Sequence, residues 1–89
     1  MPYIKEYNRN FLKEIAIGLV VTEITNPGEL NYLFTRTILR YITCKGESYQ
    51  TYNDIIGALE ACKLEIYRRK ISPYEDKKIK ENGDLNGMS

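Results

Sequence analysis

Histidine and tryptophan are both missing from this sequence, and eight tyrosines and two phenylalanines supply all of its aromatic rings. Without histidine the chain lacks the commonest general base, the commonest metal ligand and the usual pH switch of proteins. It also has no phosphate-binding glycine loop, no HExxH or CxxC motif, and no serine or cysteine with a histidine to activate it. We therefore expect a protein that is not an enzyme and that uses no metal or cofactor.

Cysteine and long apolar runs are scarce. Cys44 and Cys62 lack the close spacing of a metal knuckle or redox pair and fall within or at the ends of apolar runs, so we expect reduced, semi-buried thiols. No stretch approaches the roughly 20 apolar residues that span a bilayer, and the N-terminus has no signal-peptide core. These features predict a cytoplasmic protein without a membrane segment.

Net charge is also small, because 13 basic and 12 acidic side chains leave a formal charge of +1. No whole-molecule field would draw such a chain to DNA or an anionic membrane, which disfavours general nucleic-acid binding. A chain of 89 residues with 43% hydrophobic residues can fold as one small domain, and such domains often borrow core from a partner. We expect a single helical domain over residues 1–83 and a mobile C-terminal tail over residues 84–89.

Apolar residues recur at intervals of three and four along most of the chain, which predicts helices. The first covers residues 10–24, where the pair Val20-Val21 leaves a short strand as the alternative. The second starts at Asn26-Pro27-Gly28-Glu29, which supplies a cap, a first helical residue and a capping box, and it stops at Lys45-Gly46. Gly18, within the first helix, suggests that another backbone or a ligand approaches closely.

The third predicted helix runs from about Tyr52 to Ile71 after an entry at residues 48–51, and Gly57 in its interior carries the same suggestion of a close approach. Ser72-Pro73 ends it and opens a short helix that Asn82-Gly83 closes. The apolar stripe of the third predicted helix consists of Ile55, Ile56, Leu59, Cys62 and Ile66. Short connections favour antiparallel packing of successive helices. We therefore expect an all-α fold, a small helical bundle in which flanking helices pack against an antiparallel helical hairpin. We also expect this bundle to assemble as a homo-oligomer.

Tyrosine and arginine lie close together in two places. Tyr32, Arg36 and Arg40 are spaced by four and form a ridge on one helical face. An aromatic plane beside guanidinium groups can stack a base and clamp a phosphate, although packing and protein interfaces use the same residues more often. Tyr67-Arg68-Arg69-Lys70 is a second basic cluster, which the helix dipole would favour even without a ligand.

Acidic pairs are the remaining candidates for chemistry. Asp54 with Glu60, or Glu75 with Asp76, could form an acid–base or metal-binding pair. Acidic residues at such spacing on a helix are far more often solvated surface. An enzyme is therefore the last of the hypotheses.

Six stretches of the sequence, MPYI, PGELNY, YNDIIGALE, YRR, PYEDKKI and NGDL, carry a resemblance to a known family. Together they resemble small uncharacterised proteins of tailed phages, prophages and bacteria, and the likeness leaves out only residues 14–25 and the last four. The resemblance implies that the segment from Pro73 to Leu85 packs or binds, and that the protein works in a bacterial host cytoplasm. The chain is also similar in size, helicity and Tyr/Arg content to phage oligomers that sequester cyclic nucleotides of bacterial immunity, an analogy at the level of fold.

The leading functional hypothesis is a non-catalytic homo-oligomer that traps a cyclic nucleotide immune signal at a subunit interface, with tyrosines stacking the base and cations neutralising phosphate. The expected ligand-binding residues are Tyr3, Lys5, Tyr32, Arg36, Arg68 and Arg69. The chief alternative is a protein–protein interaction module that inhibits a host factor or assists phage assembly. A small nucleic-acid-binding domain that uses the basic end of the third helix ranks third.

Overall fold

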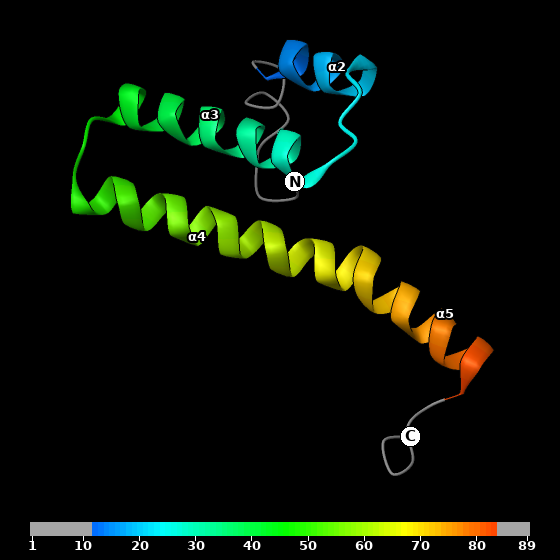
Figure 1. Cartoon of the computed structure of the whole chain (residues 1–89). Helices are drawn as coiled ribbons and strands as arrows, with labels where there is room; N and C mark the ends of the chain where they lie inside the picture. Colours follow the sequence, from blue (N-terminus) through cyan, green and yellow to red (C-terminus); the bar gives the residue numbers. More distant parts are fainter. Residues whose placement is uncertain (1–11, 84–89) are drawn as a thin grey trace. The chain divides into compact units, whose positions relative to one another are not determined.

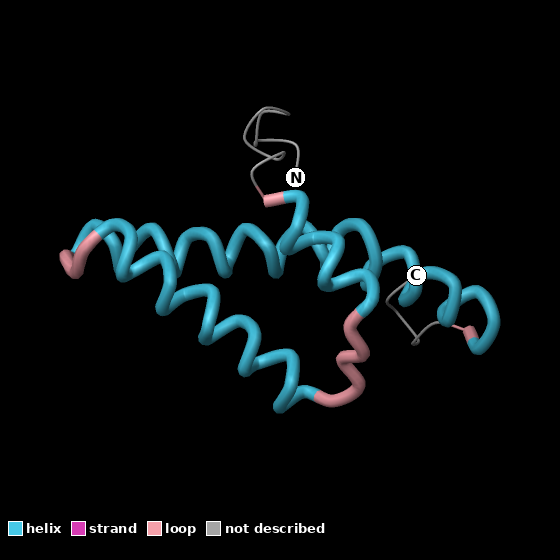
Figure 2. The backbone as a smooth tube through the Cα atoms, turned by 90° about the horizontal axis from the view of Figure 1, so that it is seen from above, coloured by secondary structure: helices cyan, strands magenta, loops and turns pink. Residues whose placement is uncertain are grey.

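The computed structural model describes residues 12–83, and all of the regular structure in this range is helical (Figures 1 and 2). The elements are α2 (Lys13–Val21), α3 (Pro27–Lys45), α4 (Tyr49–Ile66), the π turn η1 (Tyr67–Ile71) and α5 (Ser72–Asn82). The all-α class is confirmed, and the alternative of a strand at Val20-Val21 is wrong, because both residues belong to α2.

The chain divides into two compact units, residues 1–37 and residues 38–89, and each is described by itself below. The boundary falls within α3. The expectation of a single domain over residues 1–83 stays a prediction. The expected tail at residues 84–89 lies outside the described part of the chain.

In the first unit, α2 ends at Val21, three residues before the predicted end at residue 24. Thr22 already has extended backbone, with ψ at 131°, and its hydroxyl donates to the carbonyl of Gly18 at 2.6 Å. A run of β-branched residues weakens helix propensity here, and the Thr22 hydroxyl satisfies a carbonyl of the last turn. The predicted start at residue 10 lies outside the described residues.

The start of α3 follows the prediction. The side-chain oxygen of Asn26 accepts a hydrogen bond from the backbone N–H of Glu29 at 2.9 Å, and Pro27 is the first helical residue. The Glu29 carboxylate reaches back to the backbone N–H of Thr25 at 2.8 Å. This is a capping box extended by one residue, and it satisfies donors that the first turn leaves without an intrahelical partner.

In the second unit, a three-residue connection joins the end of α3 to α4. Gly46 has φ of +85°, a left-handed conformation that favours glycine, and its N–H bonds the carbonyl of Ile42 at 2.8 Å. α4 begins at Tyr49, three residues before the predicted start, because Ser48 caps it by accepting from the N–H of Thr51 at 3.1 Å.

The most buried residues in the described range lie at this connection. Thr51 is 3% exposed and Ile55 is 9% exposed. The Thr51 hydroxyl donates to the carbonyl of Gly46 at 2.7 Å, and the Tyr41 hydroxyl donates to Asp54 at 2.8 Å, which ties the last turns of α3 to the first turns of α4. Residues 38–56 therefore form the antiparallel corner of the predicted hairpin.

Beyond the corner, the helix continues without a break from α4 through η1 into α5 (Figure 2). α5 begins at Ser72, with Pro73 in its first turn, as predicted. The predicted cap and break are wrong, because Ser72 makes no side-chain cap and lies inside a continuing helix with helical φ and ψ. Its N–H bonds the carbonyl of Tyr67, five residues back. The wider turn takes up one extra residue just before Pro73, which itself has no N–H to donate. Gly83 ends α5 as predicted, with φ of +85°.

Several predicted buried groups are exposed instead. Cys44 and Cys62 are free, as expected, but exposed and not semi-buried. A Cβ placed on Gly18 or Gly57 would meet no described atom within 4 Å, so neither glycine marks a close approach within the described chain. Of the predicted stripe on the third helix only Ile55 is buried. The difference arises because most of the α4–α5 helix has no neighbouring element from its own unit.

Candidate functional site

The aromatic and basic pair Tyr32 and Arg36 lies on α3 in the first unit. The two residues are one helical turn apart, and both side chains are exposed, Tyr32 by 62%. No salt bridge within residues 12–83 involves Arg36. The structure thus brings these two predicted residues together with their functional groups accessible.

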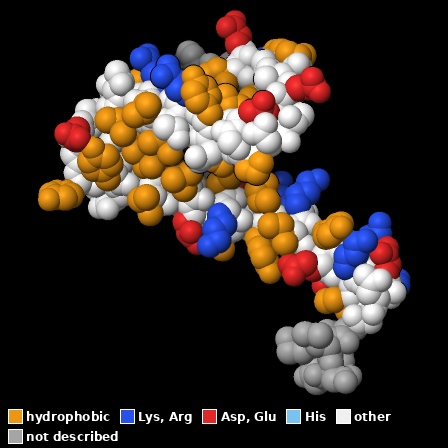
Figure 3. Space-filling view, in the orientation of Figure 1, with side chains coloured by type: hydrophobic (Ala, Val, Ile, Leu, Met, Phe, Trp, Pro, Cys, Tyr) orange, Lys and Arg blue, Asp and Glu red, His pale blue; other side chains and the backbone are white. Residues whose placement is uncertain are grey.

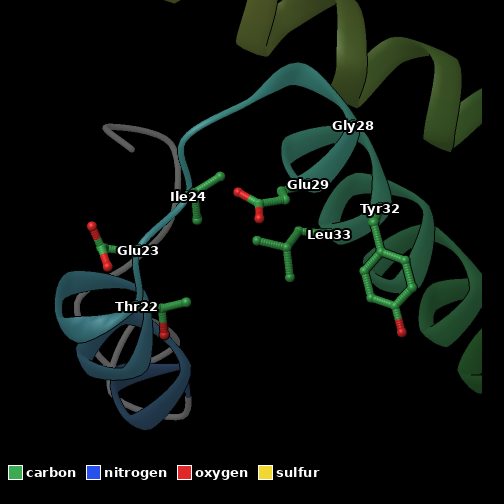
Figure 4. Close-up of a pocket in the computed structure, with 7 residues that line it drawn as sticks. All are labelled: Thr22, Glu23, Ile24, Gly28, Glu29, Tyr32 and Leu33. Atoms are coloured by element: carbon green, nitrogen blue, oxygen red, sulfur yellow. The ribbon is translucent and has the colours of Figure 1, made fainter.

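Tyr32 also borders a pocket of about 420 Å³ between the end of α2 and the start of α3 (Figure 4). Glu29 and Leu33 point from α3 toward the segment at Thr22 and Ile24, and the Tyr32 ring lies beyond Leu33. The lining residues are Thr22, Glu23, Ile24, Gly28, Glu29, Tyr32 and Leu33. Six of these seven residues were not among the predicted ligand-binding residues, and Tyr32 is the exception.

The charge of this pocket is acidic. Glu23 and Glu29 are its acidic side chains, and no lysine or arginine lines it. The Glu29 carboxylate is occupied by the Thr25 N–H, while Ile24 and Leu33 supply apolar surface. A phosphate would be repelled here, so the pocket suits an apolar or basic group from another molecule. Sequence reasoning missed it because Glu23 lies in a connection whose path no periodicity predicts.

A polar cluster at the corner uses Asp54. One of its oxygens accepts from Gln50 at 2.7 Å and the other from Tyr41 at 2.8 Å. These two hydrogen bonds hold the pKa of Asp54 below its usual value of 3.8, and the carboxylate in turn raises the pKa of Tyr41. Asp54 is therefore a structural acceptor. Glu60 lies six residues further along α4, on a different face, and pairs with Lys63 at 3.6 Å.

The second acidic pair also makes separate contacts. Glu75 accepts a hydrogen bond from the Tyr67 hydroxyl, which raises the pKa of Tyr67. Asp76 is its exposed sequence neighbour and points to a different side of the helix. Neither pair has the arrangement of two carboxylates that face one substrate.

The basic cluster of the second unit lies on the π turn. Arg69 pairs with Glu65 at 3.4 Å, whereas no ion pair within the described residues involves Arg68. Arg68 and Lys70 are exposed. Single π turns inside α-helices occur frequently at functional sites, and sequence periodicity gave no sign of this one. Further along, Lys78 lies over the Tyr74 ring, 5.5 Å from its centroid.

Two of the predicted ligand-binding residues, Tyr3 and Lys5, lie outside the described residues. Within residues 12–83 no group of three or more cysteine, aspartate or glutamate side chains is placed to hold a metal ion. None of the helices in this range combines the length and the hydropathy needed to cross a bilayer.

Comparison with protein families shows to which family the chain belongs. The model of a family described as a domain of unknown function, DUF6899, matches residues 1–85. The chain belongs to the DUF6899 family. No curated protein and no solved structure shows significant similarity to it.

The DUF6899 match confirms the coarser part of the resemblance found in the sequence, which is membership of an uncharacterised family across nearly the whole chain. The match includes all of η1 and α5 and ends at Leu85. The C-terminal helix is therefore part of the DUF6899 domain and is not an appendage to it.

Proposed function

We propose that this chain is a non-catalytic protein-interaction module that presents apolar helix faces to a protein partner, a second copy of the chain included. The observation that carries this proposal is the exposure of its large hydrophobic side chains. Twenty of them are at least 40% exposed, while Ile55 is the one large hydrophobic residue that is buried in the described range. Exposed apolar surface on this scale is typical of interaction sites and is uncommon on isolated soluble domains.

The distribution of these side chains supports binding along helices. Hydrophobic groups lie at the surface over the α4–α5 helix, interspersed with Lys, Arg, Asp and Glu (Figure 3). In the first unit, Val20 and Val21 are exposed by 85% and 79% at the end of α2. An amphipathic helix that buries one face in a partner has this mixed pattern.

The polar side chains support a role without catalysis. Both oxygens of Asp54 hold the corner together, Glu60 pairs with a neighbouring lysine, and Glu75 accepts from Tyr67. These carboxylates are used in structure. The acidic, partly apolar pocket beside Tyr32 fits a side chain of a protein better than it fits a phosphate.

Site-specific photo-crosslinking tests the proposal. Tyr32 and Tyr74, exposed by 62% and 61%, are each replaced by benzoylphenylalanine in the full chain, with Tyr49, exposed by 91%, as the matched control at the start of α4. An aromatic residue replaces an aromatic residue at all three positions. We expect discrete crosslinked products at Tyr32 or Tyr74, at the mass of two chains or of one chain with one partner, and little at Tyr49. No discrete product at either position in producing cells would refute the proposal.

Sequestration of a cyclic nucleotide is the second candidate function. It is favoured by Tyr32 and Arg36, which lie one turn apart on α3 with both groups accessible. In this arrangement a base stacks on Tyr32 and the phosphates lie toward Arg36, away from the acidic pocket. Basic residues from another copy of the chain, such as Arg68, would neutralise the remaining phosphate charge of the cyclic nucleotide.

The test is retention of ligand. The purified chain is incubated with a panel of cyclic di- and trinucleotides, desalted and heated, and the released nucleotide is identified by chromatography. We expect release of at least one member, with loss in Tyr32→Ala and Arg36→Ala and retention in Lys80→Ala, an exposed cation on α5. No retention of any member by the unmodified chain would end this candidate.

A further inference from the structure

The helix formed by α4, η1 and α5 carries one apolar face along its length. Leu59, Cys62 and Ile66 follow at spacings of three and four, so they share a face of α4. The side chains of Leu59 and Ile66 are exposed by 40% and 48%. From residue 57 onward, no other described element of the second unit packs on this face.

The π turn keeps the apolar face continuous. Ile71 follows Ile66 by five residues, a spacing that would place it on another side of a regular α-helix. In η1 the N–H of Ser72 bonds the carbonyl of Tyr67, five residues back, so a residue five positions on lies nearly above its predecessor. Ile71, exposed by 41%, and Tyr74, exposed by 61%, therefore extend the line of Leu59 and Ile66.

Charge is segregated along the same helix. Residues 46–62 contain three acidic side chains and no basic one, and residues 63–70 contain four basic side chains and one acidic one. The acidic residues are Glu47, Asp54 and Glu60, and the basic ones are Lys63, Arg68, Arg69 and Lys70. A copy aligned in parallel would place the basic cluster against itself, whereas an antiparallel copy places it against the acidic stretch. Flanking charges of this kind set partner choice and orientation in paired helices.

We propose that a second copy of this chain covers the apolar face, with the two α4–α5 helices antiparallel and their centre near Leu64. Two identical patches related by a twofold axis satisfy each other, which is the commonest symmetry of oligomers. The inference rests on the proposed function and specifies its partner. Apolar contacts of Leu59, Ile66 and Ile71 supply affinity, and the segregated charges fix the direction.

Association is measured first. Sedimentation equilibrium of the full chain should give the mass of two chains. Ile66→Asp should weaken the dimer by about tenfold or more, since it removes a buried apolar contact and buries a charge. Leu64→Asp is the matched control, because Leu64 is 58% exposed and lies off the apolar face. It should change the dissociation constant by less than about twofold, and circular dichroism checks that both variants are helical.

Orientation is measured by pulsed electron paramagnetic resonance with spin labels on Lys80→Cys, in a chain that also carries Cys44→Ser and Cys62→Ala. Lys80 lies 16 residues from the proposed centre, so labels on two antiparallel copies are about 45–50 Å apart at a rise of 1.5 Å per residue. Parallel copies would hold them about 25 Å apart, side by side. A label on Leu64→Cys should give a short distance of about 25 Å in the antiparallel dimer.

A long distance at residue 80 together with a short one at residue 64 supports the proposal. A short distance at residue 80, a mass of one chain, or a mass of three or more chains overturns it. If the chain sediments as a monomer while benzoylphenylalanine at Tyr74 still captures one other protein, the interaction module stands and the second copy is wrong.

Discussion

Thr51→Val should lower the free energy of unfolding by about 1 kcal/mol. Thr51 is the most buried residue of the described range, and its hydroxyl donates to the carbonyl of Gly46 at 2.7 Å. Valine has nearly the same shape, so the substitution removes the hydroxyl without opening a cavity. The cost is close to that of one neutral hydrogen bond because Gly46 is exposed and water can reach its carbonyl.

A change of this size lowers the melting temperature by about 4–8 °C in a domain of this length. The assay is thermal unfolding followed by circular dichroism, with all variants at one protein concentration, because association shifts the transition. Thr43→Val is the matched control: its hydroxyl also donates to a carbonyl, that of Leu39 at 3.1 Å, but within one exposed helix. It should move the transition little.

Equal melting temperatures for Thr51→Val and the unmodified chain would refute the claim that the buried hydrogen bond of Thr51 at the corner stabilises the fold. The same conclusion follows if Thr43→Val is destabilised as strongly as Thr51→Val. Thr51→Ser, which keeps the donor to Gly46, should retain more stability than Thr51→Ala.

Three further predictions concern the helices. Gly57→Ala should raise the free energy of unfolding by about 1 kcal/mol, because its Cβ enters open space. Gly46→Ala should lower the free energy of unfolding, because Gly46 has φ of +85°. Urea titration of both variants checks that the two changes have opposite signs. Asp54 has a lowered pKa in the folded chain, so its contribution to the free energy of unfolding is present above about pH 4 and is lost as pH falls through its folded pKa. Asp54→Asn should therefore make the melting temperature less dependent on pH in melts from pH 2 to 6. An unchanged pH dependence would contradict this role of Asp54. Finally, the Cys62 thiol should react more slowly with Ellman's reagent as protein concentration rises, while Cys44 reacts at a constant rate; equal behaviour of the two would oppose pairing through the α4 face.

The helix boundaries that the sequence predicted correctly are those with local chemical causes. Asn26 and Glu29 cap α3, and Gly46 and Gly83 end helices with φ of +85°. Each of these devices works within four residues, so the sequence around it is sufficient to predict it. The same logic failed at Ser72-Pro73, where a π turn lets the helix continue. No local pattern distinguishes a proline that ends a helix from one that follows a widened turn.

Burial was harder to predict than helicity. The periodicity of Leu59, Cys62 and Ile66 predicted correctly that they share a face, but it could not say what covers that face. The pocket beside Tyr32 depends on where the connection after α2 places Glu23 and Ile24, a path that no periodic pattern describes. Tyr32 and Arg36 were found because a helix fixes the relation of residues four apart.

The π turn at η1 sets the direction in which α5 presents its apolar residues. One turn there holds an extra residue, so Tyr74, eight residues after Ile66, lies where the seventh residue would lie in a regular α-helix. If the five residues of η1 adopted regular α hydrogen bonding with none of them removed, α5 would rotate about its own axis by roughly 100°. Tyr74 would then no longer follow Leu59 and Ile66, although no side chain at a contact had been altered. Deleting one residue between Tyr67 and Ile71 would instead give a regular α-helix with the same apolar face, so related sequences that are one residue shorter here should keep the apolar positions of α5.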